Sequence, residues 1–226
     1  MKIAVVTAIF GGIDSPKPFC KQSVECDYFC FTEEHSPFPL PNLPDRLKAK
    51  YFKLQSHYIL PGYDYYVWID GNVQVTSPHF IKKLIDASPD GIAIQKHHER
   101  ANIKEEIDFI LDSENPYLTV RYANQPLFGE YMAYIEAGMP EDAPLYSCNI
   151  FGYSAQSFEV HSNVSLMNTW WNICLRWSWF DQSAFSYLAW YFDNSFTMFH
   201  GVEIVDFGPM FDNPYFKLHS HDNWAQ

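Results

Sequence analysis

Apolar and polar positions follow two different periods along the first part of the chain. Residues 2–10 (KIAVVTAIF) form an almost unbroken β-branched apolar run that ends at two glycines, residues 11–12. Such a run predicts a strand buried on both faces of a parallel sheet. Residues 65–69 (YYVWI) form a second run of this kind, which stops at residues 70–72 (DGN). Between the two runs, apolar residues recur at helical spacing over residues 45–60, which predicts an amphipathic helix.

The rest of the chain continues this alternation of strands and helices. Further strands are expected at Asp27 to Thr32, Gly91 to Gln95, Leu145 to Tyr153 and Val202 to Asp206. Further helices are expected after Pro78, around Ile103 to Leu111, from about Phe158 to Trp177 and from Asp181 to Phe192. This pattern predicts an α/β fold with a mixed, mainly parallel central sheet and helices on both faces. Ligands of such sheets bind at the carboxyl edge of the strands, here beside residues 7–12 and 70–72.

Length and composition favour one folded domain over residues 1–226. Hydrophobic residues make up 47% of the chain and charged residues 19%, which suffices for one sizeable core but hardly for two independent ones. The sequence contains no internal repeat and no convincing linker. The five cysteines are odd in number and form no CxxC pair, which favours reduced core thiols over a disulfide framework or a zinc site.

The charge balance excludes several classes of partner. Fifteen Lys and Arg against 27 Asp and Glu give a net charge of −12, a poor match for nucleic acid or an anionic membrane. No stretch reaches the roughly 20 apolar residues of a membrane span, and the first residues lack the pattern of a signal peptide. We therefore expect a cytoplasmic protein without an integral membrane segment. A phosphate-bearing ligand would need a local cluster of cations or a bound metal.

Asp70 and Asn72 carry oxygen atoms at the end of a predicted buried strand, separated by one glycine. Mg²⁺ and Mn²⁺ prefer such oxygen ligands and often share them with substrate phosphates. The alternative is a tight turn, because Asp, Gly and Asn are common turn residues. His219, in a His-Ser-His triplet near residue 220, is a candidate for a further metal ligand; the alternative is a polar tail.

Cationic side chains lie on two segments near the expected ligand edge. Lys50 and Lys53, with Arg46, stand on the helix before the Asp70 strand and can neutralise a diphosphate, or they form the solvated face of that helix. His97 and Arg100 follow the strand at 91–95, in either a substrate-binding loop or a polar connection between strand and helix. Neither GxGxxG nor a P-loop motif is present, so phosphates must be held in another way.

Aromatic residues make up 18% of the chain, more than a core needs for volume, so some are expected to line a site. The densest group contains Trp170 and Trp171 and lies before Asp181 and Gln182. Aromatic faces can stack on a sugar while carboxylates and amides bind its hydroxyl groups. Asp181 is also a candidate N-cap of the helix that follows, a role compatible with function.

Several of these segments, taken in order, resemble a known family. The matching stretches are VVTAIFGGID, DYFCFTEE, AKYFKLQSH, YYVWIDGNVQV, KHHER and WWNICLRWSWFDQSAFSY. They are similar to the glycosyltransferase-like domain of the plant turgor-regulation-defect and mucilage-related proteins. The resemblance spans about residues 2–187, and the WIDG and DQ-S-F elements are fairly specific in combination.

The resemblance implies a GT-A type fold, a UDP- or GDP-sugar donor and transfer to a hydroxyl of a glycan or glycolipid acceptor, for example in bacterial polysaccharide or glycan synthesis. Residues 1–100 would form the nucleotide-sugar-binding half and residues 101–226 the acceptor-binding half. Asp70 and Asn72 stand where such enzymes keep an aspartate-x-aspartate motif for Mn²⁺ or Mg²⁺, and Asp181-Gln182 stands at an arginine-aspartate-glutamine element.

Residue roles follow from this resemblance together with the chemistry of glycosyl transfer. Thr7, Ala8 and Phe10 would form the pocket for the nucleotide base and ribose. Asp181 is the expected general base if the anomeric centre inverts; if configuration is retained, it would orient the acceptor or stabilise positive charge at the anomeric carbon.

Two other functions are compatible with the sequence. A non-catalytic glycan-binding module is favoured by Asn72, which replaces a second carboxylate, and by Phe180, which stands where the family usually has Arg. A nucleotidyltransferase is disfavoured by the lack of a Gly-rich phosphate loop.

Overall fold

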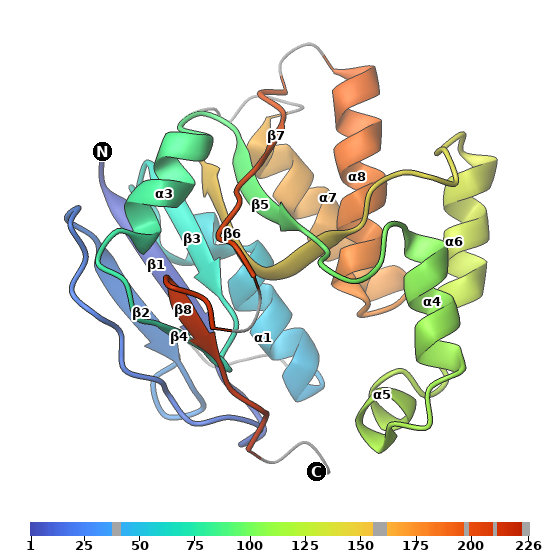
Figure 1. The fold of residues 1–226 in the computed structure, drawn as a ribbon, viewed down its shortest axis with the longest axis horizontal. Coiled ribbons are helices and arrows are strands. Elements are labelled where there is room, and N and C mark those ends of the chain that lie inside the picture. The colour runs from blue at the N-terminus through green and yellow to red at the C-terminus, as the bar shows by residue number, and fades with distance from the viewer. Residues whose placement is uncertain (38–41, 156–161, 197–198, 210–211, 223–226) are drawn as a thin grey trace.

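Six strands form the central sheet of the protein, whose computed structural model describes residues 1–37, 42–155, 162–196, 199–209 and 212–222. They are β1 (Ile3–Ala8), β2 (Asp27–Phe31), β3 (Tyr65–Ile69), β5 (Ile92–Lys96), β6 (Tyr146–Ser154) and β7 (Val202–Ile204). Their order across the sheet is β2-β1-β3-β6-β5-β7 (Figure 1). β6 runs antiparallel to both of its neighbours, and the other adjacent strands are parallel. The prediction of an α/β fold with a mixed, mainly parallel central sheet is confirmed.

Three helices cover one face of the sheet: α1 (Asp45–Leu54), α7 (Asn163–Arg176) and α8 (Asp181–Ser195). Their apolar side chains form one core with alternate residues of β1, among them Val6, which is 1% exposed. Val5 of the same strand points into a second core on the opposite face. Both faces of β1 are therefore buried, which explains why its sequence is continuously apolar rather than alternating.

The second core lies beneath α3 (Phe80–Ala87) and a small two-stranded sheet. In this small sheet β4 (Val73–Val75) pairs antiparallel with β8 (Phe216–Leu218). The sequence predicted neither strand, because three residues are too short to show a period. Their pairing holds the segment around residue 219 beside β4, where His219 N–H donates to the Asn72 carbonyl at 2.9 Å.

A helical lobe stands beside α8, on the right of Figure 1. It contains α4 (Ile103–Leu111), α5 (Pro116–Arg121) and α6 (Leu127–Glu136), and α4 and α6 pack around a third apolar core that includes Phe180. α4 has the predicted bounds, with Asn102 as its N-cap accepting from Glu105 N–H. α5 and α6 were not predicted, although the sequence Asn-Pro at 115–116 is a helix-start signal and Asn115 does cap α5.

Two predicted helices differ from the observed ones. The helix expected over 45–60 ends at Leu54, and a separate short helix, α2 (Ser56–Ile59), follows. Gln55 between them has φ −120° and ψ 20°, outside the helical range, and the Ser56 hydroxyl donates to the Phe52 carbonyl, a bond that bends helices. The helix expected from Phe158 begins at Asn163, and residues 158–161 lie outside the described residues.

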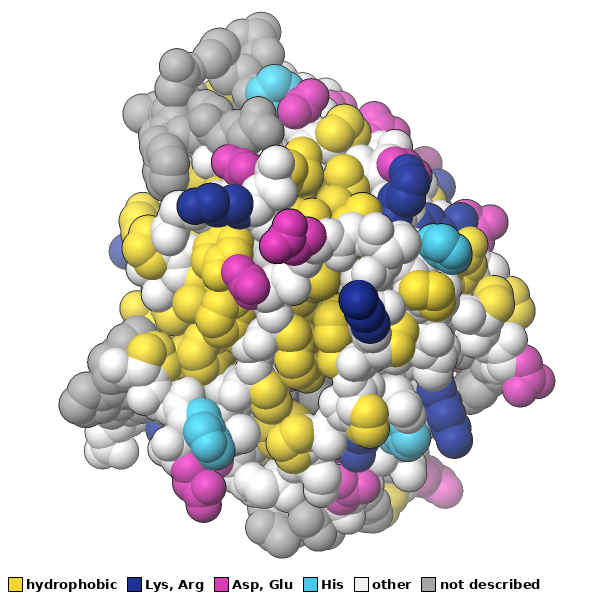
Figure 2. Space-filling model, turned by 90° about the vertical axis from the view of Figure 1, so that its left-hand side faces the viewer, with side chains coloured by type: hydrophobic (Ala, Val, Ile, Leu, Met, Phe, Trp, Pro, Cys, Tyr) yellow, Lys and Arg dark blue, Asp and Glu magenta, His cyan; other side chains and the backbone are white. Residues whose placement is uncertain are grey.

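β2 forms one edge of the sheet, and Figure 2 views the molecule from that side. Hydrophobic side chains gather over the middle of this face. At the edge itself, the Tyr28 ring stacks on Phe19 with 4.5 Å between centroids, so the segment that follows β1 partly covers the strand. Among the described helices, none combines the length and the apolar character that crossing a bilayer requires.

Candidate functional site

A cavity of about 600 Å³ opens at the carboxyl edge of β1 and β3. β1 lies between β2 and β3, so the connections on its two sides run in opposite directions across the sheet, and this is where ligands of α/β sheets bind. Ala8 and Phe10 reach the cavity from the end of β1, and Asp70 and Asn72 from the end of β3. The first residues of β6 complete this wall because β6 runs antiparallel and begins at the same edge. Both halves of the chain therefore line the cavity.

The turn after β1 brings α1 against the cavity. Gly11 and Gly12 have φ values of 70° and 62°, which favour glycine. A Cβ atom on Gly11 would also lie 2.8 Å from the Asp45 carboxylate at the start of α1. The Gly-Gly pair therefore allows the first turn of α1 to approach the end of β1.

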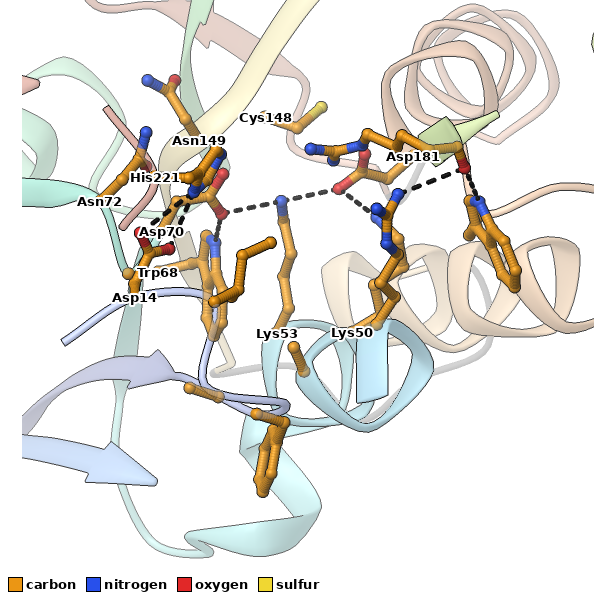
Figure 3. A pocket seen from close by; sticks show the side chains of 18 of the residues that line it. Asp14, Lys50, Lys53, Trp68, Asp70, Asn72, Cys148, Asn149, Asp181 and His221 are labelled. Carbon is orange, nitrogen blue, oxygen red and sulfur yellow. Dashed lines mark hydrogen bonds and ion pairs between the residues drawn. The ribbon is translucent and has the colours of Figure 1, made fainter. Parts of the chain in front are cut away.

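A chain of four charged side chains, three of them buried, runs from α1 to α8 and the end of β3 (Figure 3). The ammonium groups of Lys50 and Lys53 lie 2.8 and 2.7 Å from the same Asp181 oxygen, Oδ2. Lys53 also reaches Asp70 Oδ1 at 3.3 Å, and this oxygen accepts a 2.6 Å hydrogen bond from Trp68 Nε1. The side chains of Lys50, Lys53 and Asp181 are only 9%, 5% and 8% exposed. We call Lys50, Asp181, Lys53 and Asp70 the ion chain.

The ion chain fixes the protonation state of its central carboxylate. Burial raises the pKa of Asp181, but the charges and hydrogen bonds of Lys50 and Lys53 outweigh this and hold the pKa well below its ordinary value. Burial likewise lowers the pKa of Lys53, but Asp181 and Asp70 outweigh it and raise the pKa. Asp181 is therefore an anion at any working pH, and a carboxylate stabilised in this way is a weak proton acceptor.

A second set of polar contacts closes the cavity on the β1 side. His221 Nδ1 lies 3.1 and 3.0 Å from the two Asp14 oxygens, and His221 Nε2 lies 3.0 Å from the Tyr117 hydroxyl. Asp14 and His221 both line the cavity. His219, the predicted metal ligand, does not line it: its Nε2 lies 3.0 Å from Gln74 Oε1. The chain thus directs the second histidine of the triplet into the site and the first away from it.

The aromatic pair expected to stack on a sugar is not open to the cavity. Trp170 is 0% exposed, and its ring packs against Phe151 and Phe185 in the core. Its Nε1 donates to the Asp181 carbonyl at 3.0 Å, so it positions the start of α8. Trp171 contacts the Tyr51 ring and is likewise absent from the cavity wall. The prediction that Trp170 stacks on a sugar is therefore wrong, because the packing of α7 on the sheet buries its ring.

Other predicted residues divide between the cavity wall and the layer behind it. Lys50, Lys53, His97 and Gln182 line the cavity together with Ala8, Phe10, Asp70, Asn72 and Asp181. Thr7 lies one residue behind the wall and is 3% exposed, so it does not meet a ligand there. Arg100 pairs with Glu99 at 2.9 Å, contacts Glu106 and lies 3.2 Å from His97 Nε2, directly behind the wall. Burial and the Arg100 charge lower the pKa of His97 to about 4, so its imidazole is neutral at pH 7.

Several wall residues were missed in the sequence, among them Arg121, Tyr122 and Trp179. Arg121 and Tyr122 come from the end of α5, whose Asn-Pro start signal could have revealed the helix but not its position beside the cavity. Trp179 belongs to the aromatic group before Asp181. Its Nε1 donates to the Arg121 carbonyl at 3.0 Å, which turns this ring, rather than Trp170, toward the site.

The oxygen atoms at the end of β3 allow only a limited metal site. Within the described ranges, no three His, Cys, Asp or Glu side chains gather closely enough to hold a metal. Asn72 uses its amide nitrogen to donate to the His219 carbonyl at 3.2 Å, and Asp70 accepts both of its donors at Oδ1. The amide oxygen of Asn72 and Oδ2 of Asp70 thus remain as candidate metal ligands. This donor set fits a Mg²⁺ or Mn²⁺ ion that takes its other ligands from water and substrate phosphates.

Comparison with protein families identifies the family of the chain. The model of the TOD1/MUCI70 glycosyltransferase-like domain matches residues 39–209, about three quarters of the chain. The chain belongs to this family. The TOD1/MUCI70 match includes the whole ion chain, whereas β1, Asp14 and His221 lie outside it. No curated protein matches the sequence significantly. The family predicted from the sequence is thus confirmed, and the protein contains a glycosyltransferase-like domain.

Proposed function

We propose that the protein is an active glycosyltransferase that moves a sugar from a UDP- or GDP-sugar to a hydroxyl group of a glycan or glycolipid acceptor. Membership of the TOD1/MUCI70 family supports the reaction class. The observation that carries the proposal is the ion chain, which lies in the cavity at the carboxyl edge of β1 and β3. A structural role alone would not require four charged side chains on the wall of one cavity.

The reaction needs positive charge where the donor bond breaks. Negative charge grows on the departing nucleoside diphosphate, so cations at that point lower the barrier. Lys50 and Lys53 are already matched by Asp181 and Asp70, and they supply little net charge of their own. We therefore propose that Asp70 and Asn72 hold Mg²⁺ or Mn²⁺, which supplies charge neutralisation at the diphosphate when bound.

Asp181 suits an electrostatic role better than proton transfer. Its carboxylate already accepts from two ammonium groups, and its low pKa makes it a weak general base. Both ammonium groups contact Oδ2 of this carboxylate, so Oδ1 is the oxygen that would face positive charge developing at the anomeric carbon of the donor sugar. We propose this role for Asp181, with Gln182 beside it as a donor to sugar hydroxyl groups.

The apolar part of the wall suits the nucleotide. Ala8, Phe10 and Ala49 line the cavity between β1 and α1. The Phe10 ring stacks on Phe52 with 5.5 Å between centroids and is 3% exposed, so it offers an edge rather than a full face. We propose that the base or ribose packs against this surface.

A panel of nucleotide sugars tests the proposal. Thermal-shift binding and product formation are measured with UDP- and GDP-sugars in the presence of Mn²⁺ or Mg²⁺. We expect at least one donor to bind and react, and Asp70→Ala to abolish turnover by removing both a metal ligand and a partner of Lys53. Asp86→Ala is the matched control, because Asp86 lies on the exposed side of α3 and pairs only with Lys82 among the described residues.

Two results would contradict the transferase proposal. One is the absence of binding and turnover across the whole panel; the other is full activity of Asp70→Ala. Glycan-array binding that survives Asp70→Ala, with no response to nucleotides or divalent metals, would instead identify a glycan-binding module, the alternative that the neutral Asn72 favours.

A further inference from the structure

Two arginines lie together on the α1 and α5 side of the cavity. Arg46 stands in the first turn of α1, and Arg121 is the last residue of α5. Both line the cavity. Arg46 Nη1 donates to the Arg121 carbonyl at 3.2 Å, so two segments 75 residues apart in the sequence bring the guanidinium groups to one place.

Neither arginine forms a close ion pair in the described part of the chain. Among the described residues, no carboxylate lies within ion-pair distance of Arg46 or Arg121, whereas the two lysines of the ion chain share Asp181. Burial lowers the pKa of Arg121, but the more distant charges around it, those of Asp181 and Asp70 included, outweigh burial and raise the pKa. Burial lowers the pKa of Arg46, and the nearby charge of Arg121 lowers it further. The two groups therefore repel each other in the absence of an anion, and an anion between them would relieve that repulsion.

One guanidinium nitrogen also lacks a hydrogen-bond acceptor. Arg121 Nε is buried and donates to no described group. Buried donors are nearly always paired in folded proteins, so the hydrogen bonds of the Arg121 guanidinium are incomplete within the described part of the chain. The rest of the guanidinium is held in place: it lies over the rings of Tyr117 and Tyr122, 5.3 and 5.4 Å from their centroids, and one nitrogen contacts the Tyr117 hydroxyl.

The carboxylates on the cavity wall contact partners other than these two arginines. Asp45, the neighbour of Arg46 in the first turn of α1, lies 2.6 Å from the Lys48 ammonium group. Asp14 and Asp70 lie close together near the ends of β1 and β3 (Figure 3). Asp181 is occupied by the two lysines. The protein carries a net charge of −12, yet this part of the cavity wall holds two guanidinium groups without ion pairs, together with the rings of Trp179 and Tyr122. Its local charge is therefore opposite in sign to that of the protein as a whole.

We propose that Arg46 and Arg121 form an oxyanion-binding subsite that takes a phosphate or carboxylate group of a substrate. The planar guanidinium presents paired donors that match the two oxygens of such a group. This inference deepens the proposed function, because it rests on the cavity being the substrate site. The oxyanion has two possible sources, the diphosphate of the donor and the carboxylate of an acidic sugar.

Binding measurements with four probes distinguish these sources. Calorimetry or ligand-detected NMR follows UDP, GDP, inorganic phosphate and glucuronate on the wild type, Arg46→Gln and Arg121→Gln. Charge-assisted hydrogen bonds of this kind predict a loss of affinity of about 10- to 100-fold for each variant. Lys82→Gln is the control, because it removes one positive charge from an exposed ion pair on α3 and is expected to leave all affinities unchanged.

The pattern of losses identifies the ligand. Weaker binding of UDP and GDP with unchanged glucuronate binding assigns the subsite to the donor diphosphate, and the reverse assigns it to an acidic sugar. Arg121→Lys keeps the charge but not the paired donors, so it is expected to recover only part of the affinity. If Arg121→Gln does not fold, Arg46→Gln alone tests the subsite, since its side chain makes one described hydrogen bond, to the Arg121 carbonyl.

The subsite and the transferase proposal fail in different ways. Unchanged affinities of Arg46→Gln and Arg121→Gln for every probe that the wild type binds, or no binding of any of the four probes by the wild type, would overturn the subsite. Loss of phosphate or glucuronate binding in these variants, without turnover of any nucleotide sugar, would support the subsite and contradict the transferase.

Discussion

Replacing Asp181 by Asn removes the negative charge that two buried ammonium groups share. Lys50 then has no carboxylate partner among the described residues, whereas Lys53 keeps Asp70 at 3.3 Å. Breaking a buried ion pair by removing one partner costs about 3 to 5 kcal/mol, because the remaining charge stays buried without compensation. We expect a value near the lower end, about 3 kcal/mol, since one of the two lysines remains paired and Asn fills almost the same volume.

Thermal and urea unfolding measure this loss. For a chain of this size each kcal/mol shifts the Tm by about 2 to 4 °C, so Asp181→Asn should melt about 6 to 12 °C below the wild type. The matched control is Asp86→Asn. Its partner Lys82 and Asp86 itself are 52% and 59% exposed, and exposed pairs contribute about 0 to 1 kcal/mol.

The pH dependence provides an independent check. The folded-state pKa of Asp181 is lowered, so the stabilisation from its charge is fully present above the unfolded-state pKa of about 3.9 and is lost as the pH falls below it. The difference between wild type and Asp181→Asn should therefore be constant near neutral pH and should narrow below about pH 4. Equal Tm values for Asp181→Asn and Asp86→Asn would refute the reasoning.

Two further substitutions test other parts of the fold. Burial raises the pKa of Glu130 to about 7, despite hydrogen bonds from two hydroxyl groups. The free energy of unfolding of the wild type should therefore fall by about 3 to 4 kcal/mol as the pH rises from about 4.3 to 7. Glu130→Gln should remove this pH dependence. Gly152→Ala would bring a Cβ atom within 2.6 Å of the fully buried Tyr65 ring, and overpacking of this kind should lower the unfolding free energy by about 1 to 3 kcal/mol in urea titrations.

For each of the two substitutions, Glu130→Gln and Gly152→Ala, a further result can contradict the prediction. Wild-type and Glu130→Gln stabilities that run parallel between pH 4 and 7 would contradict the buried, uncharged carboxyl. Gly129→Ala, in α6 with open space around the new methyl group, should be neutral or stabilise by up to about 1 kcal/mol. Equal effects of the two glycine substitutions would show that Tyr65 does not pack against Gly152 as described.

The elements predicted correctly are those whose signal is local. The apolar runs of β1 and β3 reflect burial on both faces of the sheet, and α4 carries both helical spacing and an Asn N-cap at residue 102. These features depend only on neighbours in the chain. The position of Asp70 at the ligand edge followed from them, because a residue that ends a parallel strand lies at its carboxyl edge.

Features that depend on distant partners were not predictable. Trp170 and Trp179 belong to the same aromatic group in the sequence, yet one is fully buried against Phe151 and the other lines the cavity. Only the packing of α7 on the sheet separates them. Lys53 and Asp181 are 128 residues apart, so their pairing, and with it the low pKa of Asp181, could not be inferred from either segment alone.

The contact between Asp14 and His221 has a consequence for the order of folding. These residues are 207 positions apart, and β8 holds the second of them in reach by pairing with β4. A nascent chain can form β1, β3 and the ion chain before β8 has been synthesised, but it cannot close the cavity on the β1 side. Contacts of such long separation form late. Closure of this cavity should therefore be among the last steps as the protein folds during synthesis.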